Sequence, residues 1–316
     1  MPLSIARQGA QPRLGDLLAP YQRHLAAEAK SAKTISIYRR AVDDLLAFLD
    51  RNGLRTEPAA IDREALDTFM SEYLARHAAT TASICYRALQ QCFRWLEQEG
   101  YLAENPFRKM RPPQVPEAPV PILVEDELRR LLRTCERRKD FRSVRDYAIL
   151  RVFIDGGCRL GEVAGLRWSP DDPERQDVML DEGLLRVVGK GSRTRFVALG
   201  PRTVASLDRY LAIRTYHPSA DLPWLWLSGA KHSRFTESGI GQMVGDRALE
   251  AGIGHVHAHQ LRHTFAHRWM TAGGGEQDLM RLAGWRSPQM LARYGASAAA
   301  ERAVAAHHRM RPAEDL

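Results

Sequence analysis

Hydrophobic residues in the first third of the chain recur every three or four positions, which is the spacing of one face of an α-helix. Four such stretches lie between residues 15 and 109. Asn52-Gly53 follows the second stretch, Asp62 precedes the third, and Gly100 follows the fourth; residues of these types are typical of helix boundaries. We therefore predict a module of four amphipathic helices in this part of the chain.

A proline-rich segment at residues 111–121 separates this module from the rest of the chain. It contains five prolines, and proline lacks the N–H that a helix requires and stiffens an extended backbone. This composition is typical of a linker, although a rigid surface loop within one domain also has it. We predict an N-terminal helical domain at 1–110, a linker at 111–121 and a second domain at 122–316.

The second domain combines the helical period with one short β pattern. Apolar runs at 184–188 and 195–199 flank Gly189-Lys190-Gly191-Ser192, which predicts a β-hairpin with a glycine-rich turn. Gly156-Gly157 ends an earlier helical stretch, and a new helix is expected near Arg159. The fold class is therefore mainly α with a small antiparallel β-sheet, in two domains. Helices are expected at residues 124–136, 144–153, 201–214, 237–251, 260–272, 276–283 and 288–294.

Composition narrows the class of protein further. The chain has 316 residues, of which 44% are hydrophobic, enough to bury two cores. Its formal net charge of +8 favours a polyanionic partner. No apolar run approaches the roughly 20 residues of a membrane span, and no apolar signal segment lies at residues 1–13. The four cysteines form no C-x-x-C pair and are expected to be free thiols in a reducing compartment, so we expect a cytoplasmic protein with no membrane contact.

Two arginines, Arg159 and Arg262, are candidates for binding a phosphate. A guanidinium stays charged and offers a planar fork to phosphate oxygens, which allows phosphoryl transfer without a metal. Arg159 follows the Gly156-Gly157 break, and Glu162 lies three residues later on the same helical face. The Glu162 carboxylate either orients this site or forms an ordinary exposed pair; the spacing alone fits both.

Histidines near Arg262 allow two interpretations. His259 lies three residues before Arg262 at an expected helix start, where an imidazole can accept or donate a proton. His259, His263 and His267 also recur every four residues, a spacing that zinc sites use. The H-E-x-x-H pattern and a completing cysteine pair are both absent from the sequence. We therefore expect no metal and no other cofactor, with a zinc hydrolase as the least favoured alternative.

Three further side chains complete the candidate chemistry. Lys190, between two glycines in the expected turn, is a candidate general acid or a solvated turn lysine. Trp285 offers an indole N–H that donates but transfers no proton, or it packs in the core. Tyr294 is a phenol with a reference pKa of about 10, which is either a nucleophile activated by nearby cations or a packing residue.

In this order along the chain, these segments resemble the tyrosine recombinase (phage integrase-like) family, and within it the simple Xer-like enzymes. The family pattern covers nearly the whole chain, and the run from His259 to Ala266 is its most specific part. Most members carry histidine where this chain has Trp285, which implies hydrogen-bond donation there and no proton transfer. By the resemblance, the catalytic residues are Arg159, Lys190, His259, Arg262, Trp285 and the nucleophile Tyr294, with Glu162 in support.

The resemblance also implies an activity and its partners. The N-terminal core-binding (SAM-like) domain and the catalytic domain would close on double-stranded DNA as a clamp. Tyr294 would form a 3′-phosphotyrosyl bond, without ATP or metal, and four protomers would exchange strands through a Holliday junction at specific recombination sites. Accessory recombination proteins and a role in a mobile element fit the same pattern.

Other functions remain open at this point. A type IB topoisomerase would use nearly the same residues to relax DNA, and a non-catalytic relative would only bind it. The alanine-rich tail at 296–310 is expected to dock either on a neighbouring protomer or on its own domain.

Overall fold

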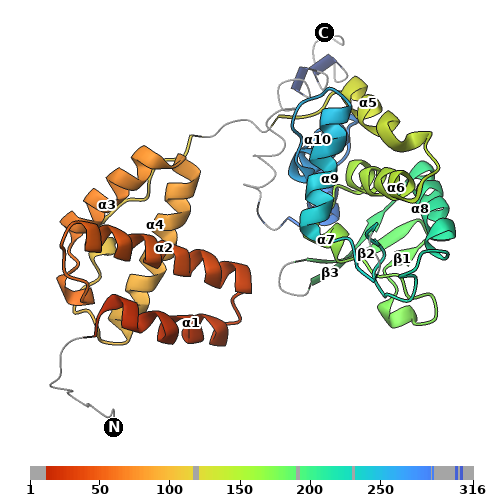
Figure 1. Cartoon of the computed structure of the whole chain (residues 1–316). Coiled ribbons are helices and arrows are strands. Elements are labelled where there is room, and N and C mark those ends of the chain that lie inside the picture. The colour runs from red at the N-terminus through yellow and green to blue at the C-terminus, as the bar shows by residue number, and fades with distance from the viewer. Residues whose placement is uncertain are drawn as a thin grey trace. The chain divides into compact units, whose positions relative to one another are not determined.

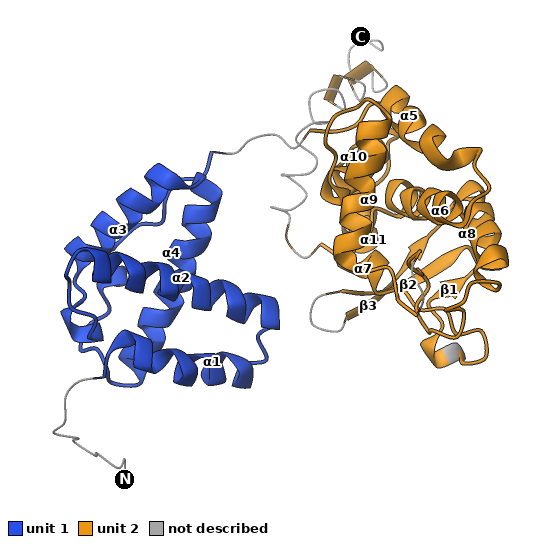
Figure 2. Cartoon of the chain, in the orientation of Figure 1, with its two compact units in different colours: residues 1–118 blue, residues 119–316 orange. Residues whose placement is uncertain are grey.

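The computed structural model of the chain describes residues 12–116, 121–189, 193–229, 232–285 and 287, with 303–304 and 307–308 in the tail. The chain forms two compact units, Met1–Ala118 and Pro119–Leu316 (Figure 2). Lys190, Tyr294, the helix expected at 288–294 and most of the tail lie outside the described residues.

The first unit is the predicted module of four helices (Figure 1). Two of the helices begin at polar caps. Asp62, which the sequence marks as a helix start, accepts a hydrogen bond at Oδ1 from the Ala65 N–H at 2.9 Å, and Ser31 Oγ accepts one from the Thr34 N–H at 3.2 Å. The elements of the unit are η1 (Leu14–Leu17), α1 (Leu18–Ala27), α2 (Ala32–Arg51), η2 (Pro58–Ala60), α3 (Arg63–Arg76), α4 (Ala79–Gln98) and η3 (Pro106–Lys109).

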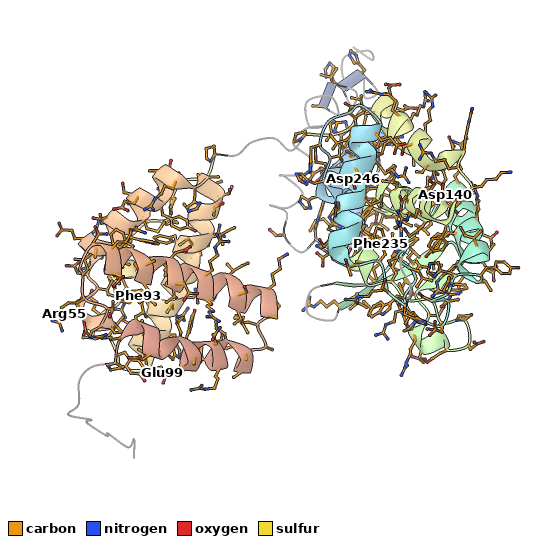
Figure 3. The ribbon with its side chains drawn as sticks, viewed as in Figure 1. Arg55, Phe93, Glu99, Asp140, Phe235 and Asp246 are labelled. Atoms are coloured by element: carbon orange, nitrogen blue, oxygen red, sulfur yellow. The ribbon has the colours of Figure 1, made fainter. Side chains whose placement is uncertain are left out.

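Aromatic side chains fill much of the core of this unit. The rings of Phe48 on α2 and Phe69 on α3 meet edge to face at 5.4 Å between centroids. Phe93 on α4, which is labelled in Figure 3, packs against Phe107 at 5.3 Å. Both contacts belong to one buried core that α1, α2, α3, α4 and η3 share.

The second unit consists of helices around a small sheet (Figure 1). Strands β2 (Leu184–Gly189) and β3 (Arg193–Ala198) form the predicted antiparallel pair, from Leu184 opposite Ala198 to Gly189 opposite Arg193. A two-residue strand, β1 (Val178–Met179), extends the sheet beside β2 and is too short to show a period in the sequence. The helices are α5 (Glu125–Glu136), α6 (Phe141–Gly156), α7 (Leu160–Ala164), α8 (Pro201–Arg214), α9 (Glu237–Glu250), α10 (Ala258–Thr271) and α11 (Glu276–Ala283), with η4 (Pro173–Arg175) before β1.

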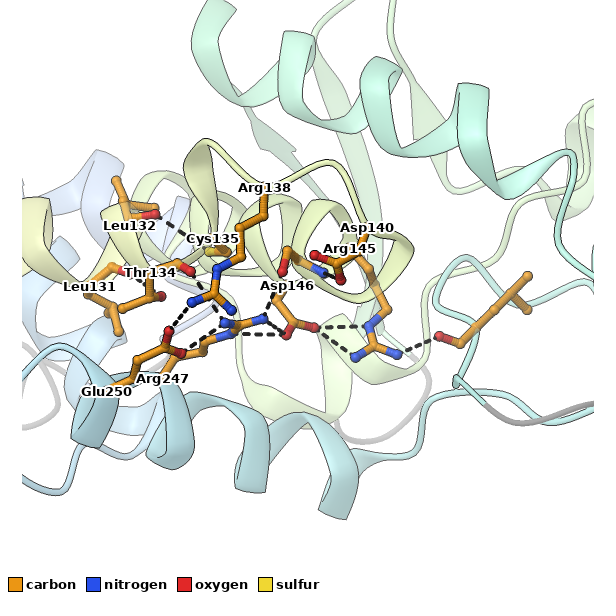
Figure 4. Close-up of polar contacts among 12 residues, drawn as sticks. Leu131, Leu132, Thr134, Cys135, Arg138, Asp140, Arg145, Asp146, Arg247 and Glu250 are labelled. Atoms are coloured by element: carbon orange, nitrogen blue, oxygen red, sulfur yellow. Dashed lines mark hydrogen bonds and ion pairs between the residues drawn. The ribbon is translucent and has the colours of Figure 1, made fainter.

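A charged network links three helices of the second unit (Figure 4). The buried carboxylate of Asp146 on α6 accepts hydrogen bonds from Arg145 Nη2 and from Arg247 Nη2, both at 2.8 Å. Arg247, on α9, also pairs with Glu250 at 2.9 Å and donates to the Thr134 carbonyl of α5. This network, which we call the Asp146 cluster, joins α5, α6 and α9.

The guanidinium of Arg145 also stacks on an aromatic ring. Its carbon lies 3.7 Å from the ring centroid of Phe235, which Figure 3 labels, and its Nη1 donates to the Leu227 carbonyl at 2.9 Å. The Asp146 cluster therefore also fixes the segment between α8 and α9.

A small core separate from the main one holds α10 and α11 together. Its buried members are Ala266, Met270, Leu279, Ala283 and Trp285. The four cysteines are buried, and each is a free thiol. Within the part of the chain that the structure describes, no helix is long and apolar enough to cross a membrane.

Candidate active site

The site begins where the backbone turns at the end of α6. Gly157 caps this helix with φ of 55°, in the left-handed region that favours glycine. A Cβ at this position would lie 2.1 Å from Cδ1 of Phe265 on α10. Only glycine therefore lets the two segments approach this closely, and the Gly157 carbonyl accepts a hydrogen bond from Arg262 Nη1 at 2.6 Å.

Arg159 and Glu162 form a pair in which one member is buried. The Arg159 N–H donates to Glu162 Oε2 and Arg159 Nη1 donates to Oε1, both at 2.8 Å. The Glu162 side chain is 3% exposed and that of Arg159 is 41% exposed. The pair is therefore not an ordinary exposed ion pair: the buried carboxylate supports a guanidinium that reaches solvent.

A second arginine, which the sequence analysis missed, binds the same carboxylate. Arg195 on β3 donates from Nη1 to Glu162 Oε1 at 2.6 Å and from Nη2 to Oε2 at 2.8 Å, and its side chain is 14% exposed. Burial alone would raise the pKa of Glu162, but the hydrogen bonds from Arg195 and from the Arg159 backbone lower it to about 2. Glu162 is therefore a carboxylate at neutral pH.

The strand period contains a signal for Arg195. Successive strand side chains point to opposite faces, so Arg195 lies on the same face as Val197, two positions later. Val197 and Val187, which is paired with Arg195 across the sheet, are both 1% exposed. An arginine at a core-facing position of a strand needs a buried partner, and this rule points to Arg195.

Arg262 lies on α10 and is 1% exposed. Besides the contact with Gly157, its Nη2 donates to the Ala283 carbonyl at the end of α11, at 2.5 Å. Its guanidinium carbon lies 5.4 Å from the ring centroid of Trp285, a distance at which a cation is attracted to the indole face. Trp285 is itself 6% exposed.

His259 lies in the first turn of α10 and is exposed. Its ring contacts that of the buried His263 edge to face, at 4.9 Å between centroids. His259, Arg159, Glu162 and Gly189 all line one pocket of about 590 Å³. Gly189 ends β2 directly before Lys190, and a Cβ built there would lie 3.4 Å from Glu162 Oε1.

The structure thus brings five of the seven candidate residues to one region of the second unit: Arg159, Glu162, His259, Arg262 and Trp285. Lys190 and Tyr294 are outside the described residues, so their roles stay predictions. Across the ranges that the structure describes, no group of three or more His, Cys, Asp or Glu side chains is arranged to hold a metal ion. Arginines dominate the charged groups of the region, which suits an anion such as a phosphodiester.

Comparison with known proteins places this arrangement in a family. The sequence model of the phage integrase family matches residues 121–301, and that of the phage integrase N-terminal SAM-like domain matches residues 17–101. The tyrosine recombinase XerC of Xylella fastidiosa (strain M23) is 30% identical over 257 residues, covering 80% of this chain and 82% of XerC. That of Neisseria meningitidis serogroup C (strain 053442) is 29% identical over 273 residues, covering 84% and 86%.

Solved structures share the fold. The XerH site-specific recombinase bound to a palindromic difH substrate aligns with a TM-score of 0.72 and 18% identity, covering 92% of this chain and 83% of XerH. A lambda integrase dimer bound to a COC′ core site aligns with a TM-score of 0.68 and 17% identity, covering 90% and 77%.

The helical fold with its small sheet, the arginine-rich site and these relatives together define a tyrosine recombinase of the Xer-like class. The chain belongs to the phage integrase family. The predicted family, fold class and class of enzyme are therefore confirmed.

Proposed function

We propose that this enzyme cleaves and rejoins double-stranded DNA at specific recombination sites through a 3′-phosphotyrosyl bond to Tyr294. One observation carries the proposal: Arg159, which caps the start of α7, and Arg262 on α10 both donate to the backbone that ends α11. That backbone leads through Trp285 to Tyr294, nine residues later. The two arginines that we assign to the phosphate are therefore hydrogen-bonded to the backbone from which the chain continues to Tyr294.

Each residue has a distinct role in the proposed reaction. The Tyr294 oxygen forms a bond to phosphorus while the bond from phosphorus to the 5′-oxygen breaks, and Lys190 gives that oxygen its proton. Arg159, Arg262 and the Trp285 indole N–H hold the nonbridging oxygens, where negative charge develops. His259 assists at the nucleophile, and Glu162 orients Arg159. Attack by a 5′-hydroxyl reverses the step, so the phosphodiester bond is regained without ATP.

The relatives support the partners that we propose. The lambda integrase structures include a dimer on a core site and a tetramer bound to a Holliday junction. We propose that four copies of this chain act on two DNA sites in the cytoplasm, with accessory recombination proteins. Residues 1–110 would form the core-binding half of a DNA clamp and 111–121 the linker. The formal net charge of +8 supports binding to the DNA backbone.

The test is capture of covalently attached DNA under denaturing conditions. Cells expressing the wild type or Tyr294→Phe are lysed in detergent, and DNA that stays bound to the protein is sequenced. We expect discrete sites that depend on Tyr294. Scattered adducts would contradict site-specific recombination in favour of topoisomerase chemistry, and adducts formed by Tyr294→Phe would contradict the nucleophile.

A further inference from the structure

The C-terminal end of α11 is capped first by its own backbone. Gly284, with φ of 64°, places the Trp285 N–H on the Met280 carbonyl at 2.9 Å, and its own N–H bonds to the Arg281 carbonyl at 3.2 Å. This is the arrangement of a Schellman cap. It satisfies two of the last four helix carbonyls, which have no partner within the helix.

Arginines from three separate segments bind the carbonyls that follow. A helix C-terminus carries partial negative charge, so cations there are stabilising. We call this set of contacts the arginine clasp. Its donor–acceptor pairs are Arg195 Nε to Leu282 O at 2.7 Å, Arg262 Nη2 to Ala283 O at 2.5 Å and Arg159 Nη2 to Gly284 O at 3.2 Å.

Arg195 differs from the other two arginines of the clasp. Arg159 and Arg262 have phosphate-binding roles in the proposed reaction, whereas that reaction assigns no role to Arg195. One edge of its guanidinium faces both oxygens of Glu162, and its Nε faces the Leu282 carbonyl. Arg195 therefore joins the carboxylate that holds Arg159 to the helix end that leads to Tyr294.

We propose that Arg195 is a positioning residue for DNA cleavage, which fixes the start of the Tyr294 segment relative to the phosphate-binding arginines. The inference deepens the proposed function and rests on it. Its physical basis is that a nucleophile displaced by about 1 Å can lose on the order of a hundredfold in rate. Lysine cannot substitute, because an ammonium is a point donor without a planar fork that reaches two carboxylate oxygens and a carbonyl together.

Another arginine of the same sheet provides a matched control. Arg186 on β2 donates from Nε to Asp177 Oδ1 at 2.9 Å and from Nη2 to the Glu174 carbonyl at 2.6 Å. It thus also bridges a buried carboxylate and a backbone carbonyl, with a side chain that is 24% exposed. Its partners precede the sheet and are unconnected with α11, so Arg186→Lys reports the cost of replacing a structural guanidinium alone.

The experiment compares Arg195→Lys, Arg186→Lys, Tyr294→Phe and the wild type. Its substrate is a nicked duplex with the DNA sequence most often recovered by adduct capture. A second form of this duplex carries a 5′-bridging sulfur at the cleaved phosphate, which leaves as a thiolate and needs no acid. Melting temperature, DNA dissociation constant and the rate of covalent adduct formation are measured well below every melting temperature.

We expect Arg195→Lys to bind DNA within about twofold of wild type but to form the adduct at least about tenfold more slowly. The sulfur substrate should not restore the rate, because the defect lies in the placement of Tyr294. Arg186→Lys should lower the melting temperature to a similar extent and cleave at the wild-type rate.

Three results would overturn the inference. A wild-type cleavage rate for Arg195→Lys would mean that Arg195 is only structural. Recovery of the rate with the sulfur substrate would mean that it acts through the leaving-group acid. If the wild type formed no Tyr294-dependent adduct, the proposed function would fail and this inference with it, whereas the first two results leave that function standing.

Discussion

Two buried carboxylates in the second unit, Asp146 and Glu162, are each held by two arginines, yet the surroundings of the two groups differ. In the Asp146 cluster both guanidiniums are largely buried, and their contacts run to Leu227, Thr134 and Glu250 within the protein. At Glu162 one guanidinium, that of Arg195, is buried, and the other, that of Arg159, lines a pocket and is 41% exposed. The same ion-pair chemistry therefore stabilises the fold in one place and presents a cation to a ligand in the other.

Asp146→Asn should have the largest effect on stability. Removing the charge leaves two buried arginines without their shared carboxylate, and breaking a buried pair costs about 3–5 kcal/mol. Chemical denaturation measures this loss. DNA cleavage per folded molecule should stay at the wild-type level. A cleavage defect in fully folded protein would mean that Asp146, like Glu162, supports the active site and not only the fold.

Arg159→Gln should have the opposite profile. Loss of a cation that stabilises transition-state charge lowers the rate by about 10²–10³-fold, whereas the unfolding free energy should change little because the side chain is partly exposed. Adduct formation in single turnover measures the rate. A variant that cleaves normally but unfolds more easily would place Arg159 with the structural arginines.

Glu162→Gln should show a smaller effect that depends on pH. Because the folded pKa is depressed to about 2, Glu162 stabilises the fold fully above its unfolded pKa of about 4.3. This contribution is lost as the pH falls from there towards 2. The difference in melting temperature between wild type and variant should therefore be constant from pH 7 to 5 and shrink below pH 4; a constant difference down to pH 3 would contradict the depressed pKa.

Arg138→Ala should have the smallest effect. Arg138 extends the Asp146 cluster by pairing with Glu250 at 2.6 Å, but its side chain is 55% exposed. Exposed pairs contribute about 0–1 kcal/mol, so the unfolding free energy should change by no more than that. A larger loss of unfolding free energy would show that the exposed pair of Arg138 and Glu250 contributes to the stability of the Asp146 cluster.

Much of the fold follows from local rules in the sequence. The caps at Ser31 and Asp62 and the left-handed turn at Gly157 each depend on one or two residues whose chemistry fixes the backbone. The Asp146 cluster does not follow in this way. Arg145 and Asp146 are consecutive residues on a helix, and only packing of distant segments on several sides of α6 buries both.

The residues of the candidate site also fall into those that local sequence motifs predict and one that depends on distant contacts. The family resemblance came from short motifs in a fixed order along the chain, which contain Arg159, Glu162, Lys190, His259, Arg262, Trp285 and Tyr294. Arg195 has no such motif around it, and its contacts to Glu162 and Leu282 span 33 and 87 positions of the sequence. The sequence signal for Arg195 is the alternation of side chains along β3, which puts this charged residue on the core-facing side of the strand.

The small core of α10 and α11 has a consequence for hydrogen exchange. Among the residues that the structure describes, a few apolar side chains and the arginine clasp hold α11. This helix is therefore expected to open locally at a lower free energy than α6, whose buried residues belong to the main core. Backbone amides of α11 should therefore exchange with solvent deuterium before those of α6. A segment that opens on its own can carry a side chain towards or away from a reacting phosphate while the rest of the domain stays folded.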